Sequence, residues 1–103
     1  LSPYGTFNDI SDSDPVSLFT YVLKQVDCLG IAYVHMIEPR ATSAGGSDII
    51  NPNAPTVSGL FRNNFKGTFI SAGGYSPESA KAAVENGQAD AIAFGRLYIS
   101  NPD

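Results

Sequence analysis

The chain has 103 residues, of which 43% are hydrophobic, and this length and composition suit a globular domain rather than a disordered segment. Ten acidic residues against six basic ones give a formal net charge of −4, and no basic run offers a contact surface for nucleic acid. No stretch reaches the about 20 apolar residues that span a bilayer. We therefore expect neither a nucleic-acid partner nor a membrane partner.

The single cysteine, Cys28, excludes a disulfide within the chain and is compatible with a reducing compartment. We expect a cytoplasmic location and leave a peroxisomal one open. Because Cys28 lies among apolar residues at the end of a helical pattern, we predict a buried structural thiol. The chain starts without methionine and both ends read as turns, so we expect it to be part of a longer protein.

The first half of the sequence predicts a helix, a strand and a long loop. Asp14 and Pro15 form a helix start, apolar residues follow at three- and four-residue spacing, and Gly30 ends the helix. Residues 31–37 are almost continuously apolar, which is typical of a strand covered on both faces in a parallel sheet. Residues 41–55 are small, polar and broken by proline, so we predict a loop.

The second half predicts two further helix–strand pairs and a final helical turn. These elements are a helix over residues 57–65, a strand over 68–71, a helix over 77–86, a strand over 91–94 and a helical turn over 97–99. The strict alternation indicates an α/β fold of repeated right-handed βαβ units. Both an open doubly wound sheet and a (β/α)8 barrel fit this pattern, and a whole barrel needs about 250 residues.

Two successive strands of this pattern end on glycine, in the stretches GTFISAGGY (67–75) and AFGRLYI (93–99). Ligands bind at the carboxyl ends of strands in parallel α/β folds, and a phosphate needs the close backbone approach that glycine permits. Arg96 adds a guanidinium suited to bidentate contact with phosphate oxygens. The pattern predicts a phosphate site from Gly73, Gly74, Gly95 and Arg96. Turns alone also require glycine at strand ends, so a purely structural interpretation stays open.

The remaining residues with potential chemistry are interpreted as structural. The single histidine, His35, lies within a strand, and we interpret it as a buried or sheet-packed side chain. Glu38 and Arg40 flank a proline at the end of the same strand. We interpret them as an ion pair or as loop anchors rather than as an acid–base pair.

Four blocks of the sequence resemble the old yellow enzyme family, which includes 12-oxophytodienoate reductases and fungal and bacterial ene-reductases. The blocks are LSPYGTFND (1–9), YVHMIEPR (33–40), FRNNFKGTFISAGGY (61–75) and AFGRLYISNPD (93–103). The resemblance implies that residues 1–103 form one partial domain of an FMN-binding TIM (β/α)8 barrel. This part is roughly the C-terminal half, from the end of strand 5 to strand 8.

The resemblance also implies an activity, an FMN-dependent oxidoreductase that takes hydride from NADPH and passes it to activated alkenes such as α,β-unsaturated carbonyls. Small enone-type molecules are then the expected substrates, and a homo-oligomer is left open. The alternative is a non-catalytic half-barrel that at most binds flavin or phosphate.

The site residues implied by the resemblance fall at the two glycine-ended strands. The residues implied to bind the FMN phosphate are Ala72, Gly73, Gly74, Gly95 and Arg96, and Phe7 is implied to lie near the substrate side of the flavin. The resemblance places the catalytic residues upstream, so we expect no catalytic residue and no metal site in this chain. We therefore expect the isolated chain to be inactive.

Overall fold

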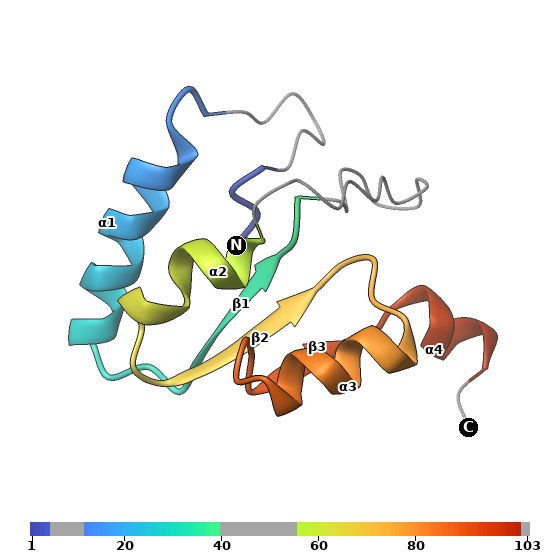
Figure 1. Cartoon of the computed structure of the whole chain (residues 1–103). Coiled ribbons are helices and arrows are strands. Elements are labelled where there is room, and N and C mark those ends of the chain that lie inside the picture. The colour runs from blue at the N-terminus through green and yellow to red at the C-terminus, as the bar shows by residue number, and fades with distance from the viewer. Residues whose placement is uncertain (5–11, 40–55, 102–103) are drawn as a thin grey trace.

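The computed structural model describes residues 1–4, 12–39 and 56–101, which form helices packed on a parallel sheet (Figure 1). In chain order the elements are α1 (Pro15–Cys28), β1 (Tyr33–Ile37), α2 (Val57–Phe61), the 3-10 helix η2 (Arg62–Asn64), β2 (Thr68–Ala72), α3 (Pro77–Glu85), β3 (Ala91–Ala93) and α4 (Arg96–Ser100). The predicted alternation of helices and strands is confirmed. The loop predicted over residues 41–55 lies outside the described residues.

The three strands are parallel and lie in the order β1-β2-β3, which is also their order along the chain. Ile37 pairs with Ala72, and Ala72 pairs with Ala93, so the carboxyl ends of all three strands reach the same edge of the sheet. Neighbouring strands that follow the chain order are the arrangement of a (β/α)8 barrel, whereas a doubly wound sheet reverses its order at a switch point.

The helices begin where the sequence predicted because their caps form. Asp14 caps α1 and Thr56 caps α2, each with a side-chain oxygen that accepts a backbone N–H, at 3.3 and 3.0 Å. Ser76 and Ser79 form a capping box at the start of α3, in which each side-chain oxygen accepts the other residue's N–H, at 3.1 and 2.9 Å. The first turn of α3 therefore carries its own cap.

The core lies between the sheet and helices α1 and α2, with α2 packed on β1 and α1 packed on α2 and η2 (Figure 1). One large side chain from each of four elements is fully buried there, namely Leu23, Met36, Phe61 and Phe69. Phe19 of α1 meets Phe61 of α2 edge to face, with ring centroids 6.4 Å apart. Since residues alternate along a strand, the neighbours of Met36 and Phe69 face the other side of the sheet.

That other side of the sheet is open within the described residues. Tyr33 is 55% exposed and His35 is also exposed, and the register places His35 beside Ile70 on this face. His35 thus lies on the sheet, but it is not buried. Strands covered on both faces were predicted, and the described residues cover only the face that carries the helices.

The prediction of a buried thiol at Cys28 is wrong, because the structure places this residue at the exposed end of α1. Cys28 follows the buried Leu23 by five positions, which is about 140° around a helix with 3.6 residues per turn. The next apolar residue, Leu29, is also exposed, so apolar neighbours at this end of α1 do not mark a buried position.

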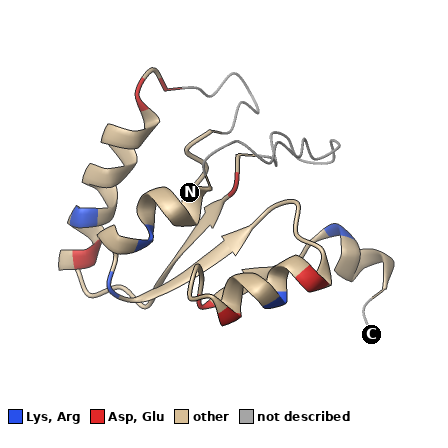
Figure 2. Cartoon of the chain, in the orientation of Figure 1, with Lys and Arg blue, Asp and Glu red and all other residues tan. Residues whose placement is uncertain are grey.

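Charges of both signs are spread over the helices and loops, while the strands carry none (Figure 2). Among the described residues, the basic side chains lie on α1, η2, the loop before β2, α3 and α4, and acidic residues are interspersed among them. No helix among these residues is long and apolar enough to cross a membrane.

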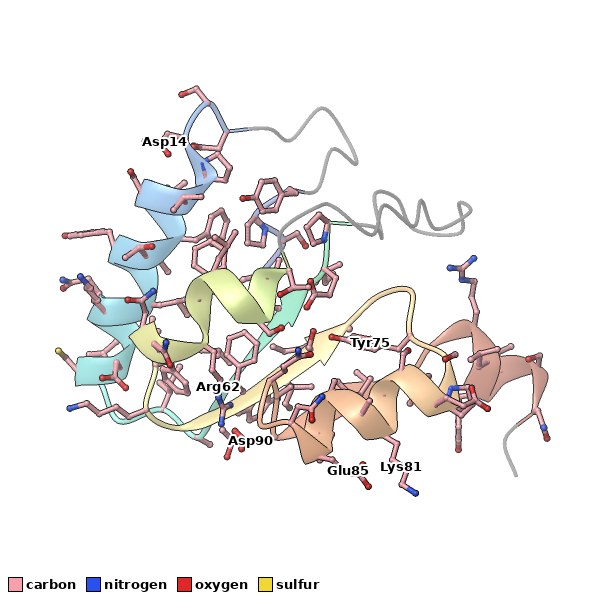
Figure 3. The ribbon with its side chains drawn as sticks, viewed as in Figure 1. Asp14, Arg62, Tyr75, Lys81, Glu85 and Asp90 are labelled. Carbon is pink, nitrogen blue, oxygen red and sulfur yellow. The ribbon has the colours of Figure 1, made fainter. Side chains whose placement is uncertain are left out.

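A bidentate ion pair lies near the amino end of β2, at the edge of the sheet opposite the glycine turn (Figure 3). The two guanidinium nitrogens of Arg62 donate to the carboxylate of Asp90 at 2.5 and 2.9 Å, and the N–H of Phe69 donates to the same carboxylate at 2.8 Å. The hydrogen bond from Arg62, followed by that from Phe69, lowers the pKa of Asp90 from 3.8 to about 2.

We expect Asp90→Asn to destabilise a complete barrel that contains this chain, by about 1 kcal/mol or less because the pair is partly exposed. A carboxyl whose pKa is lower in the folded state stabilises the fold above its unfolded pKa and loses this effect as the pH falls. The difference from the parent should therefore be constant above about pH 4 and shrink from there toward about pH 2. Thermal unfolding as a function of pH measures it.

Glu85→Gln is the matched control, since Glu85 is exposed and its only ion pair in the described structure is a 3.9 Å contact with Lys81. It should change the unfolding temperature little at any pH. A pH-independent loss for Asp90→Asn would contradict the assignment of the lowered pKa to this ion pair.

Candidate functional site

The candidate site is the edge of the sheet where β2 and β3 end. Because Ala72 pairs with Ala93, the residues that follow each strand leave the sheet side by side. After β2 the chain continues as Gly73 and Gly74, and after β3 it reaches Gly95. The sheet register thus brings together the two glycine ends that the sequence singled out.

The turn after β2 has a backbone conformation that requires glycine. Gly73 has φ +107° and Gly74 has φ +67°, both in the range that side chains disfavour. Successive backbone N–H groups in a turn can form a concave surface of partial positive charge, which is a common way to bind an anion. Ala72, the last residue of β2 and the residue before this turn, is partly buried.

The other part of the candidate site is the start of α4. Gly95 occupies the N-cap position and Arg96 is the first residue of this five-residue helix, where it is exposed. A cation in the first turn opposes the helix dipole, and an anion bound beside it would offset that unfavourable interaction. Phe7, the remaining site residue from the sequence analysis, lies outside the described residues.

A buried carboxylate lies at the same end of the sheet, directly after β1. Glu38 is 2% exposed, and its own N–H donates to the carbonyl of Ala72 at 2.8 Å. One oxygen accepts the N–H of Val57, at the start of α2, at 2.7 Å. The other accepts the hydroxyl of Ser71 at 2.9 Å and the hydroxyl of Tyr75 at 3.2 Å.

These contacts confirm the loop-anchor interpretation of Glu38, and Arg40 lies outside the described residues. The partners come from α2, from β2 and from the turn after the glycine pair, and they are 19 to 37 residues away in the sequence. The only feature of the nearby sequence that pointed to this role of Glu38 was the position of an acidic residue directly after a buried strand. The part played by Ser71 and Tyr75 had no signal in the sequence.

The described residues offer phosphate-type contacts at this edge but no metal centre. No group of three or more His, Cys, Asp or Glu residues within 1–4, 12–39 and 56–101 is placed to hold a metal ion. This edge of the sheet combines a glycine turn, which follows β2, with an arginine at the start of a short helix, which follows the adjacent strand β3.

Comparison with known proteins gives a family match along the whole chain. The family model of the NADH:flavin oxidoreductase / NADH oxidase family matches residues 1–103. Among curated proteins, 12-oxophytodienoate reductase 1 from Oryza sativa subsp. japonica is 44% identical over 106 residues, covering 100% of this chain and 26% of that protein. 12-Oxophytodienoate reductase 2 from Arabidopsis thaliana is 40% identical over 103 residues, again covering 26% of that protein.

Solved structures agree with this match. The old yellow enzyme homologue from Zymomonas mobilis superposes with a TM-score of 0.83 at 36% identity, covering 100% of this chain and 28% of that one. Morphinone reductase gives a TM-score of 0.79 at 35% identity and is covered to 26%. The chain therefore spans about a quarter of the length of these relatives, and its three strands are a piece of their (β/α)8 barrel.

Proposed function

Because the chain belongs to the NADH:flavin oxidoreductase / NADH oxidase family, we propose that residues 1–103 are the part of an FMN-dependent oxidoreductase barrel that binds the flavin phosphate. The observation that carries the proposal is the register of β2 and β3, which brings Gly73, Gly74 and Gly95 to one edge with Arg96. In barrels, the loops after strands 7 and 8 commonly bind phosphate.

The proposed contacts follow from the geometry of this edge. The turn of Gly73 and Gly74 would approach the phosphate with its backbone, and the absence of side chains leaves room for the oxygens. Arg96 would contact the same group with its guanidinium, and Ala72 and Gly95 would border it. These residues fit a dianionic phosphate because every candidate donor is a backbone N–H or a guanidinium.

The proposed activity is the reduction of activated alkenes, such as α,β-unsaturated carbonyls, by the full-length protein, meaning the barrel that includes this chain. Bound FMN would supply the hydride chemistry, with NADPH as the reductant. The residues described here would position the cofactor through its phosphate rather than touch the reacting atoms. The relatives named above take their names from small-molecule substrates, 12-oxophytodienoate and morphinone.

We further propose a cytoplasmic location.

The full-length protein is expected to purify with FMN and to oxidise NADPH when 2-cyclohexenone is added. The reason is that its family consists of flavin oxidoreductases and that this edge of the sheet would bind the FMN phosphate. The measurement is NADPH absorbance under anaerobic conditions, with NADH as a parallel reductant and cyclohexanone as the saturated control. A full-length protein that carries no flavin and cannot be reconstituted with FMN would overturn the proposal.

The same assay on the isolated chain tests the alternative of a non-catalytic half-barrel. The open face of the sheet, with Tyr33 55% exposed, favours an inactive isolated chain, since the described residues do not enclose a barrel interior. We expect no NADPH-dependent reduction by the 103-residue chain, and turnover by it would contradict this expectation.

A further inference from the structure

We propose that Glu38, Ser71 and Tyr75 form a positioning cluster that holds the Gly73–Gly74 turn in its phosphate-binding conformation. This inference rests on the function proposed above and adds residues to it that would act on the phosphate through the glycine turn. We call these three residues the Glu38 cluster.

The first step of the argument is that the glycine turn needs external support. Glycine loses more conformational freedom on folding than any other residue, and Gly73 and Gly74 have no side chains that could fix their backbone angles. The preceding residue, Ala72, is held by β-pairing with Ile37 and Ala93. The turn is therefore fixed on its strand side by the sheet, and its geometry depends on what holds the other side.

The second step is that Tyr75 holds the other side. Its side chain reaches back from the turn toward β2 (Figure 3), and its hydroxyl lies 2.9 Å from the hydroxyl of Ser71 and 3.2 Å from Glu38 Oε1. Ser71 is fully buried and donates to the same carboxylate oxygen at 2.9 Å. Since the Ser71 hydrogen is used in this way, the hydrogen of Tyr75 is shared between Ser71 and the carboxylate.

The third step is that the anchor itself is rigid. Glu38 is 2% exposed, its backbone is bonded to Ala72, and its other carboxylate oxygen accepts the N–H of Val57 at 2.7 Å. Hydrogen bonds to a buried carboxylate are stronger than those between neutral groups. A network whose members are all satisfied in this way specifies one geometry, and here it fixes the residue that follows the glycine pair.

Tyr75→Phe in the full-length protein is the most direct test, because it removes one hydroxyl and keeps the ring. Glu38 is less suitable because it also holds the start of α2. FMN and riboflavin share the same ring system but only FMN carries the phosphate, so their dissociation constants from the apoprotein separate the two ends of the flavin. We expect about tenfold weaker binding of FMN and a change of less than about twofold for riboflavin.

Tyr21→Phe is the matched control, since Tyr21 lies on α1 and is 63% exposed. It should change neither constant. Equal losses for FMN and riboflavin in Tyr75→Phe would indicate general damage and overturn the inference, as would the absence of any loss. Should Tyr75→Phe fail to fold, Ser71→Ala removes the second hydroxyl of the cluster, and the same selective loss is expected.

Arg96→Ala measured in parallel separates this inference from the proposed function. If Arg96→Ala weakens FMN selectively and the cluster variants do not, the positioning role is wrong and the phosphate site stands. If neither variant discriminates between FMN and riboflavin, the phosphate is not bound at this edge and both proposals fail.

Discussion

Replacing Arg96 by alanine in the full-length protein is expected to weaken FMN binding by about 100-fold and riboflavin binding by much less. The guanidinium is the only permanently charged group among the candidate phosphate contacts, and hydrogen bonds between charged partners are about twice as strong as neutral ones. A loss of two such bonds, at about 1.5 kcal/mol each, gives this factor. The flavin content of the purified protein and a titration of the apoprotein with FMN measure the effect.

Lys24→Ala is the charge-matched control for Arg96→Ala. Lys24 lies on the exposed face of α1, so its removal lowers the net charge equally without touching the candidate site. It should retain FMN at the parent level. Because a charge contact weakens with ionic strength, the difference between the two variants should also shrink as salt is added. Unchanged flavin content in Arg96→Ala would show that Arg96 does not bind the phosphate.

The second large effect is expected for Gly73→Ala, which should reduce both stability and FMN affinity. A φ of +107° is outside the left-handed region that an alanine adopts at moderate cost, and such strain amounts to about 1–3 kcal/mol. If the turn relaxes to accommodate the methyl group, its backbone would no longer present the N–H groups in the proposed phosphate-binding arrangement. We expect at least about tenfold weaker FMN binding, measured beside the unfolding temperature.

Gly30→Ala provides the control for backbone strain away from the site. Gly30 has φ +67° at the end of α1, and an added Cβ there would meet no atom within 4 Å. It should lower the stability by about 1 kcal/mol and leave FMN binding unchanged. If Gly30→Ala reduced FMN binding as much as Gly73→Ala does, the weaker binding in Gly73→Ala would result from general destabilisation and not from a change at the phosphate site.

The helices and the alternation of elements could be predicted because their signals are local. Asp14 and Ser76 cap their helices through neighbours three residues away, and Gly30 ends α1 with a positive φ. The pairing of Ala72 with Ala93 then follows from the strand ends. The assignment of the glycine pair to an FMN phosphate, by contrast, came from resemblance to a family, since spacing alone indicates a phosphate of any kind.

The exposure of Cys28 and the contacts of Glu38 could not be predicted in the same way. Which face of α1 is buried depends on where the sheet lies, so an apolar neighbourhood in the sequence does not decide the direction of Cys28. Glu38 finds partners up to 37 residues away, on elements that meet only in the folded chain. Local patterns carry no information about such contacts.

The two ends of β2 are secured by different carboxylates, and this separation offers two independent targets for protein engineering. Asp90 accepts hydrogen bonds from Arg62 and Phe69 at the amino end, while Glu38 accepts one from Ser71 at the carboxyl end. The two carboxylates share none of their hydrogen-bonding partners within the residues that the structure covers. Under the positioning role proposed for Glu38, substitutions that raise heat tolerance can be sought around Asp90, and substitutions that tune cofactor exchange around Glu38, with little interference between the two searches.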